Sequence, residues 1–343
     1  MKIKKDLTIF FNKVISLIVL LLINFKILSQ SDTLPKKIEI FGHIYPYFSS
    51  IYANNQKTMN SFDVSTAQVG LIKNINNKIK AIILYNVTQT TRDISVKDSV
   101  GNSLTVNYIK GSDYTLFLKQ AEVTWKTSNI TEFSAGQILN EQYLTVQDKF
   151  WGYRYIMYTM QEYFRFGHQA DFGFRWAINF KKIRFSSAIT NGEGPFYKQD
   201  KNGFLQYALN FQYLSDKWIF KIYSSYYPGE KNVQWCINPF LAYKSEKIKI
   251  GLEASKVYNY NWQEGNEFTG YSFFLTYKIN EEWSALLRQD YIEKNLLYKN
   301  LSYSLIGFEY CIDKSLKVSL NQRLLNTNAV NTWQSFINIG FTF

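Results

Sequence analysis

The chain has 343 residues, of which 18% are aromatic and 19% are charged, while only 5 are Pro. Its formal net charge is +12, but it has no run of like charge and no cluster of Arg, which argues against nucleic acid as a partner. After residue 30 no second long apolar stretch follows, and this excludes a bundle of membrane-spanning helices.

Residues 1–29 have the pattern of an export signal. Lys residues near the start precede an apolar run over 14–23, which is interrupted only by Ser16. A run of about 10 apolar residues suits a signal peptide, whereas a spanning helix needs about 20. We therefore predict a cleavable signal peptide over 1–29 and a single domain over 30–343. An uncleaved anchor helix is the alternative, and the absence of a nearby Cys excludes a lipoprotein anchor.

Alternation of apolar and polar residues with a period of two marks most of the remaining chain. The clearest case is 172–180, where Phe172 and Phe174 lie on one face and Gly173 and Arg175 lie on the other. Reading this alternation between turn signals predicts about sixteen strands, in preference to fourteen or eighteen. The predicted strands are 38–48, 62–74, 78–90, 114–127, 130–140, 168–180, 182–191, 203–215, 217–227, 234–245, 247–260, 267–279, 281–292, 302–312, 315–325 and 333–343.

The connections between the predicted strands alternate in length. Tight turns are predicted at 76–77, 128–129, 181–182, 215–216, 245–246, 280–281 and 313–314. Longer segments are predicted near 49–61, 91–113, 141–167, 192–202, 228–233, 261–266, 293–301 and 326–332. Short turns on one side and long loops on the other are the layout of outer-membrane barrels, and an even number of strands closes the ring.

These patterns predict an all-β fold, a transmembrane antiparallel β-barrel of about 16 strands in the outer membrane of a Gram-negative cell. A chain without spanning helices crosses a membrane only as a closed barrel, since only helices and barrels satisfy their backbone hydrogen bonds there. The polar face of each strand would then line a pore. A secreted soluble β-rich protein is the competing class, but it would not need aromatic residues on nearly every segment.

The third long segment, 141–167, is rich in aromatic residues, including Trp151, Tyr153 and Phe166. In water these side chains would form an exposed apolar patch. We expect the segment to fold into the lumen and pack against the wall, because a barrel of this size leaves room for it. The alternatives are a loop that lies on the lipid surface or contacts a partner protein.

Residues 149–154 and 167–173 resemble porin-type outer-membrane proteins of the Bacteroidetes, which are related to the phosphate-selective porin superfamily. Residues 135–137, 191–194 and 288–291 are similar to further motifs of that family. The resemblance implies a porin-like barrel with a constricting third loop, and trimers are common among such porins. It does not extend to phosphate selectivity, because the chain has no ladder of Arg along the wall and no Lys cluster in the loop.

Charged residues of this segment and of the polar strand faces are the candidates for a pore. The candidate constriction residues are Lys149, Arg154, Glu162 and Arg165. The candidate wall residues are Arg175, Arg184, Lys221, Arg288, Asp290 and Arg323, with Asp171, Lys249, Glu253, Glu309 and Lys317 expected on the same face. Mixed charges tune selectivity, so we predict passive diffusion of ions and other small hydrophilic solutes with a weak anion preference or none. Alternatively, these charges pair with one another and hold the loop in place.

The sequence gives little support for an enzyme. His43 and His168 are the two histidines, and neither has an evident nucleophile or carboxylate around it. No cluster has the spacing of metal ligands, so we predict no catalytic, cofactor or metal site. Cys236 and Cys311 fall in separate predicted strands and should be unpaired. A non-conducting barrel that serves as an adhesin or assembly partner is the main alternative to a porin, and a barrel hydrolase is less favoured.

The last predicted strand alternates up to Phe343. Ile337, Ile339, Phe341 and Phe343 share one face, and Asn338 lies on the other. This pattern resembles the closing strand of bacterial outer-membrane barrels, whose terminal aromatic residue is read by the barrel assembly machinery. Phe341 and Phe343 are therefore the candidate assembly signal, and the strand should pair with the one that begins near residue 38.

Overall fold

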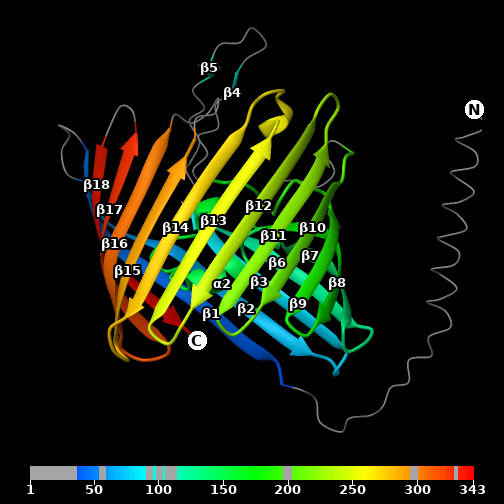
Figure 1. Cartoon of the computed structure of the whole chain (residues 1–343), viewed down its shortest axis with the longest axis horizontal. Helices are drawn as coiled ribbons and strands as arrows, with labels where there is room; N and C mark the ends of the chain where they lie inside the picture. Colours follow the sequence, from blue (N-terminus) through cyan, green and yellow to red (C-terminus); the bar gives the residue numbers. More distant parts are fainter. Residues whose placement is uncertain are drawn as a thin grey trace, which may run out of the picture. The chain divides into compact units, whose positions relative to one another are not determined.

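The computed structural model describes residues 37–53, 59–89, 96–97, 103–104, 114–195, 203–293, 300–327 and 331–343. The predicted signal peptide over 1–29 lies outside these residues. Sixteen of the described strands form one closed antiparallel barrel, which confirms the predicted fold class (Figure 1). None of the described helices has the length and apolar character that crossing a membrane requires.

The barrel strands are β1 (Glu39–Ala53), β2 (Met59–Asn74), β3 (Ile79–Gln89), β6 (Tyr114–Lys126), β7 (Thr131–Leu139), β8 (Ala170–Phe180), β9 (Ile183–Thr190), β10 (Gln206–Leu214), β11 (Trp218–Pro228), β12 (Val233–Lys244), β13 (Ile248–Tyr258), β14 (Phe268–Lys278), β15 (Trp283–Ile292), β16 (Leu301–Cys311), β17 (Leu316–Thr327) and β18 (Asn331–Thr342). Strands β4 (Val96–Lys97) and β5 (Ser103–Leu104) pair with each other outside the barrel sheet. Among the described residues, the helical elements are α2 (Val146–Trp151), α3 (Met160–Tyr163) and η1 (Tyr260–Trp262).

All sixteen predicted strands are present, and the first is the one whose end differs most from the prediction. Strand β1 continues to Ala53 and pairs with a β2 that starts at Met59, so the segment 49–61 is mostly strand rather than loop. Strands β17 and β18 likewise extend into the predicted segment 326–332. The ladder continues past the apolar alternation because backbone hydrogen bonds do not depend on the side chains that the strands carry.

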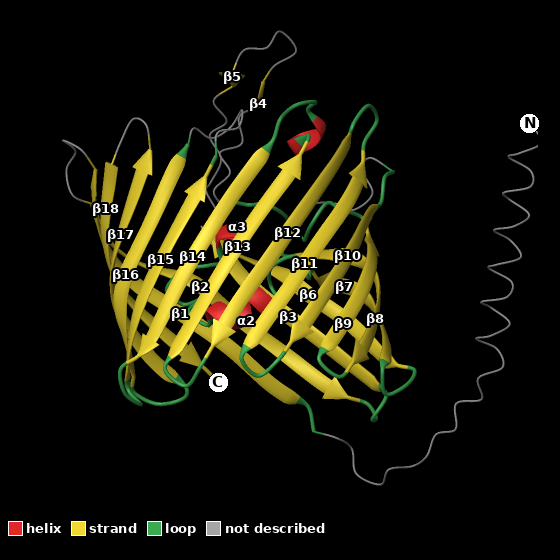
Figure 2. Cartoon of the chain, viewed as in Figure 1, coloured by secondary structure: helices red, strands yellow, loops and turns green. Residues whose placement is uncertain are grey.

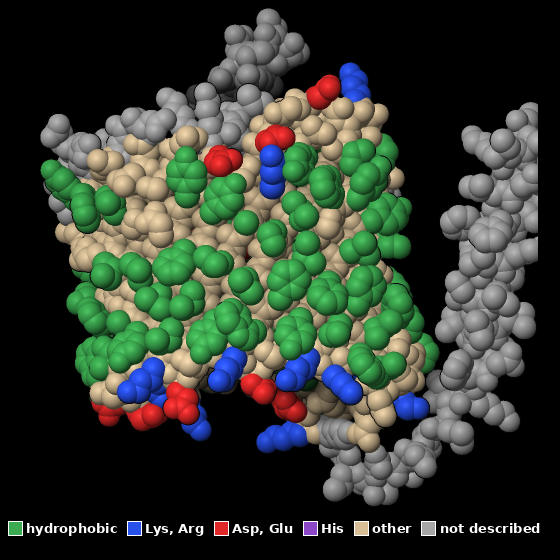
Figure 3. Space-filling model, viewed as in Figure 1, with side chains coloured by type: hydrophobic (Ala, Val, Ile, Leu, Met, Phe, Trp, Pro, Cys, Tyr) green, Lys and Arg blue, Asp and Glu red, His purple; other side chains and the backbone are tan. Residues whose placement is uncertain are grey.

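The two faces of the wall differ as the alternation predicts. In β11, Phe220 is 40% exposed on the outside, whereas the neighbouring Lys221 is completely buried inside. Figure 3 shows apolar side chains over the wall, with Lys, Arg, Asp and Glu gathered at the lower edge where the short turns lie. An apolar outer band above a charged rim suits a wall that faces lipid.

The ring closes between the first and the last strand. Strand β1 pairs with β18 in antiparallel register, as predicted from the even number of strands. The Gly42 amide donates to the Phe343 carbonyl at 2.9 Å, and the Phe343 amide donates to the Gly42 carbonyl at 3.1 Å. The Phe343 side chain is 50% exposed on the outer face. Cys236 and Cys311 are both free, which confirms that they are unpaired.

Two β-bulges interrupt the regular alternation near the start of the barrel. One separates Tyr45 from Pro46 against β2, and the other separates Leu84 from Tyr85 against β6. At the second bulge Leu84 pairs with Gln120, and Tyr85 pairs with Leu118, so Lys119 is the extra residue. A bulge of this kind changes the direction in which a side chain points. As a result Lys119 and Gln120 are both buried, although they are consecutive.

Candidate pore constriction

The segment between β7 and β8, residues 140–169, is called the third loop below, and it runs inside the barrel with α2 and α3 (Figure 2). The wall holds its backbone from several strands. Lys221 of β11 donates to the Gln142 carbonyl at 2.7 Å, and Arg323 of β17 donates to the Ile156 carbonyl at 2.7 Å. Arg288 of β15 donates to the Tyr158 carbonyl at 2.5 Å. The loop begins and ends at β7 and β8, and β15 lies about half the ring away from these strands, so the third loop crosses the lumen.

Side chains of the third loop add further bonds to the wall. The Tyr155 hydroxyl donates to Glu309 of β16 at 2.8 Å, and Gln161 donates to Glu253 of β13 at 2.5 Å. On the other side, the Tyr158 hydroxyl donates to the Ser65 carbonyl of β2 at 2.7 Å. These bonds join buried polar groups of the loop to polar groups of the wall, so they favour a single position of the loop.

The aromatic residues of the third loop are buried against the inner wall. Trp151 is 1% exposed, and its ring lies 5.0 Å from that of Phe274. Phe150 packs on Phe240 and Phe274 with ring distances of 5.9 and 6.0 Å. The inward packing expected for this aromatic segment is therefore present. In contrast, the inner face is not polar on every strand as expected. Phe240, Phe274 and Leu305 form an apolar inner surface.

Two inward-facing glycines of the wall make room for the loop. A Cβ atom on Gly340 of β18 would lie 2.7 Å from the Tyr155 ring. A Cβ atom on Gly270 of β14 would lie 2.6 Å from the Phe166 ring and 2.8 Å from the Met160 sulfur. Any larger side chain at either position would collide with the loop.

The structure brings together two of the four candidate constriction residues. The Arg154 guanidinium forms an ion pair with Asp148 at 3.0 Å and a bidentate ion pair with Glu162, one of whose bonds is 2.6 Å. Burial alone would lower the pKa of Arg154, but the charges of Glu162 and Asp148 outweigh it and raise that pKa well above its ordinary value. The expectation that Arg154 faces wall carboxylates is wrong, because its partners belong to the loop itself.

The other two constriction candidates stand apart from this cluster. Arg165 is exposed, has a left-handed φ of 61°, and makes no ion pair with any described residue. It belongs to the turn after α3. Lys149 is exposed as well and faces the space on the short-turn side of the loop.

The six candidate wall residues lie on the inner face, and all of them are bonded. Arg288 pairs with Asp290 at 2.7 Å, and Arg323 donates to Asn321 at 2.8 Å and lies 3.6 Å above the Phe336 ring. The remaining bonds are Arg175 to Glu122 at 2.6 Å, Arg184 to Glu132 at 2.7 Å and Lys221 to Gln147 at 2.6 Å. These charges therefore hold the wall and the loop together, which was one of the two sequence-based interpretations.

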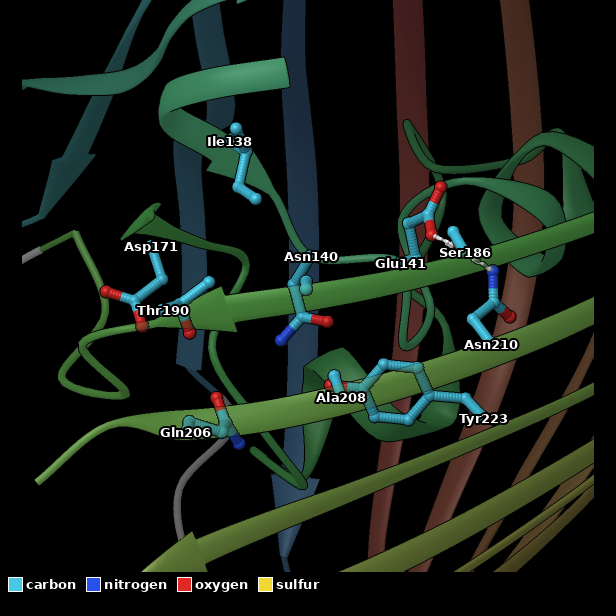
Figure 4. A pocket seen from close by; sticks show the side chains of 11 residues that line it. Ile138, Asn140, Glu141, Asp171, Ser186, Thr190, Gln206, Ala208, Asn210 and Tyr223 are labelled. Atoms are coloured by element: carbon cyan, nitrogen blue, oxygen red, sulfur yellow. Dashed lines mark hydrogen bonds between the residues drawn. The ribbon is translucent and has the colours of Figure 1, made fainter. Parts of the chain in front are cut away.

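Glu141 anchors the start of the third loop and was not among the candidates. Its carboxylate accepts hydrogen bonds from Ser186, from Asn210 at 3.1 Å and from Arg184 at 3.0 Å. Burial tends to raise the pKa of Glu141, but Arg175 and Arg184 outweigh that effect and lower it. Figure 4 shows Glu141 pointing toward Ser186 and Asn210 beside a pocket of about 20 Å³, space for about one water molecule. Glu141 follows the predicted strand 130–140 directly, and this position could have identified it as a candidate from the sequence.

A larger cavity of about 400 Å³ lies on the short-turn side of the third loop and is called the basic cavity below. Five basic residues line it, whereas Asp148 is its one acidic lining residue. The basic residues are Lys119, Lys149, Arg154, Lys314 and Lys317. Its volume is within the range of about 300–1,000 Å³ that is typical of ligand pockets.

The two histidines lie in different surroundings. The Nδ1 atom of His43 lies 3.2 Å from the Thr342 hydroxyl, and His43 lines the basic cavity. The ring of His168 lies against Gly194. Among the described residues, no group of three or more His, Cys, Asp or Glu side chains is placed to hold a metal ion.

Comparison with known proteins finds structures with a similar fold but no protein with a similar sequence. No family model matches the chain, and no curated protein matches it significantly. The Salmonella typhi OmpF complex with daunomycin is similar with a TM-score of 0.64 and 11% identity, over 90% of this chain and 98% of that one. Pseudomonas putida OprB has a TM-score of 0.63 and 9% identity over 89% and 94% of the two chains.

An anion-selective porin from Comamonas acidovorans has a TM-score of 0.62 and 12% identity, over 90% of this chain and 99% of that one. The chain has a porin-like fold. At identities this low the similarity concerns the fold alone, and what the barrel conducts has to be inferred from its own residues.

Proposed function

We propose that the protein is an outer-membrane porin of the Bacteroidetes type, a narrow channel for passive diffusion of small hydrophilic solutes. The observation that carries this proposal is the basic cavity, a charged space of about 400 Å³ inside a closed barrel. Charged side chains in a lumen need water, counter-ions or each other, and an exposed residue such as Lys149 is suited to an aqueous path.

The third loop limits what passes. It packs against strands from β11 to β17, so the path has to run along the part of the lumen that the loop does not fill. We therefore expect a small conductance. We also expect a weak preference for anions, because five of the six charged residues that line the basic cavity are basic.

Single-channel recording in planar bilayers tests this proposal. Folded protein should give stepwise currents, and the reversal potential in a KCl gradient should show a modest preference for chloride. Absence of conductance from protein that migrates as a folded barrel in a gel would contradict the proposal.

The second candidate is a non-conducting barrel that acts as an adhesin or assembly partner. The apolar contacts of Phe150 and Trp151 with the wall favour it, because they close part of the lumen like the core of a soluble protein. This candidate predicts no conductance and a phenotype that maps to the long-loop side. A barrel hydrolase, for which we propose no catalytic residue, would show turnover that is lost on replacing His43 or His168.

For export and assembly, we propose that residues 1–29 are a cleaved signal peptide and that Phe341 and Phe343 are read by the assembly machinery. Deleting residues 341–343 should abolish heat-resistant, membrane-inserted protein, because it also removes the bonds between Phe343 and Gly42. Phe343→Ala keeps those backbone bonds, so a defect in Phe343→Ala that Phe343→Tyr does not share would assign the effect to recognition of the ring. A homotrimer, which the family resemblance implies, predicts trimers after chemical crosslinking.

A further inference from the structure

One buried lysine of the basic cavity takes no part in the ion pairs of the wall. Lys119 of β6 is 4% exposed and lines the cavity, and it has no ion pair or hydrogen bond from its ammonium group among the described residues. A buried charge without a partner is costly, and proteins normally pair it or bind an ion beside it.

A β-bulge directs Lys119 into this position. Lys119 is the extra residue opposite Leu84 and Tyr85, which allows it to lie on the inner face together with Gln120. Bulges often occur next to functional sites, where they redirect one side chain. Regular pairing at this point would turn one of these two consecutive side chains toward lipid.

The charges around Lys119 are unequally balanced. Arg154 already has Asp148 and Glu162 as partners, and Lys317 pairs with Glu309 at 3.6 Å. Lys149 and Lys314 are exposed at the cavity without an ion pair to any described residue. Asp148 and Glu162 together offset the charges of Arg154 and Lys119 at the buried end, although the Lys119 ammonium group has no direct partner among the described residues. The uncompensated positive charge lies at the open end of the cavity, at Lys149 and Lys314.

The remainder of the lining combines polar residues, His43, Gln68, Ser315 and Thr342, with an apolar and aromatic part. Leu84 and Leu144 are 6% and 7% exposed, and Tyr45 and Tyr155 place their rings 6.2 Å apart at the cavity wall. A simple inorganic anion would leave these surfaces in contact with water. An anion with an apolar body would cover them and gain hydrophobic stabilisation.

We propose that the basic cavity binds a small organic anion, a carboxylate with an apolar or aromatic body. The carboxylate accepts a hydrogen bond from the Lys119 ammonium group, and the body packs between Leu84 and the two tyrosines. Lys149 and Lys314 attract the anion from the short-turn side. This site goes beyond the proposed function, because binding does not require that the barrel conducts.

Isothermal titration calorimetry of the folded full-length barrel in detergent tests the site. Sodium benzoate is the probe, and benzyl alcohol and inorganic phosphate are the comparison ligands. We expect benzoate to bind at least about tenfold more tightly than either, since one comparison lacks the charge and the other the apolar body. Equal binding of benzyl alcohol, or tighter binding of phosphate, would overturn the proposal.

Lys119→Gln is the decisive variant and should weaken benzoate binding at least about tenfold. Lys247→Gln is the matched control, because Lys247 is exposed in the turn between β12 and β13 and lies outside the cavity. It removes the same charge from the same end of the barrel and should bind benzoate like the wild type. Unchanged affinity in Lys119→Gln would overturn the proposal.

Leu84→Ala keeps the proposal testable if Lys119→Gln does not insert as a folded barrel. It should weaken benzoate binding about threefold or more while leaving acetate binding unchanged, because only benzoate has a body that contacts Leu84. An unchanged ratio of the two affinities would contradict the site. Binding without bilayer conductance would refute the proposed channel alone, whereas conductance without binding would refute the site alone.

Discussion

The third loop packs closely against one half of the barrel and leaves a cavity against the other. In the packed half, strands β11–β16, the loop makes apolar contacts and hydrogen bonds and leaves little space. In the open half, strands β1, β2, β3, β6, β7 and β18 with the start of β17, it leaves the basic cavity. The same loop therefore serves as part of a core on one side and as the wall of a cavity on the other.

The difference extends to the buried charges. In the packed half, Lys221 and Glu253 are bonded to the loop, and Arg288 is bonded to both Asp290 and the loop. In the open half, Lys119 has no such partner among the described residues, and neither does the Nε2 atom of Gln68. Paired charges fasten a loop, whereas unpaired ones are available to a solute.

The largest effect should come from breaking the packed half at Arg288. Arg288→Met leaves Asp290 buried, with Ser272 as the remaining donor to its carboxylate among the described residues, and such a loss costs about 3–5 kcal/mol. The urea concentration at which the folded barrel loses its characteristic gel mobility should fall clearly. Lys256→Met, which breaks the exposed pair with Glu267, is the control and should stay near the wild type. Equal behaviour of the two variants would show that the packed half does not depend on this pair.

An intermediate effect is expected at Gly340, where the loop touches the closing strand. Gly340→Val places atoms where the Tyr155 ring lies and should destabilise the loop packing by about 1–3 kcal/mol. Hydrogen exchange measured by mass spectrometry should then speed up in the third loop but not in the strands. Gly265→Asn is the control, since its φ of +71° suits Asn and no neighbour lies within 4 Å. Unchanged exchange in Gly340→Val would contradict the contact.

A smaller effect is expected from the arginines of the third loop. Arg154→Ala leaves Asp148 and Glu162 without their cation at the edge of the basic cavity, so the preference for chloride should fall on the order of twofold. Arg165→Ala removes an exposed arginine without an ion pair to described residues, and its reversal potential should change less. A shift at Arg165 as large as that at Arg154 would place the constriction elsewhere.

Much of the fold could be predicted from the sequence because lipid imposes a strict alternation on a barrel wall. Residues 172–180 show it clearly, and the pairing of β18 with β1 followed from the even strand number. The burial of the third loop was also predictable, since Trp151 and its aromatic neighbours could not remain in water.

Other features could not be predicted because they depend on contacts between distant segments. The inward position of Lys119 arises from a β-bulge, in which β6 has one residue more than the paired stretch of β3. Phe274 faces the lumen although Phe273 already faces lipid, so the sequence did not show which of two adjacent aromatic residues is covered by the loop. The partners of Arg154 were misassigned because the loop folds back on itself.

Cysteine labelling during bilayer recording tests the central claim that the open path follows the open half. Gln68→Cys places a thiol at the basic cavity, and Ser272→Cys places one in the packed half, where Ser272 donates to Asp290. Both are made with Cys236→Ser and Cys311→Ser, and that cysteine-free barrel is the control. A negatively charged methanethiosulfonate reagent should block the current through Gln68→Cys and leave Ser272→Cys conducting. Block of Ser272→Cys as fast as that of Gln68→Cys, or block of neither, would contradict the account.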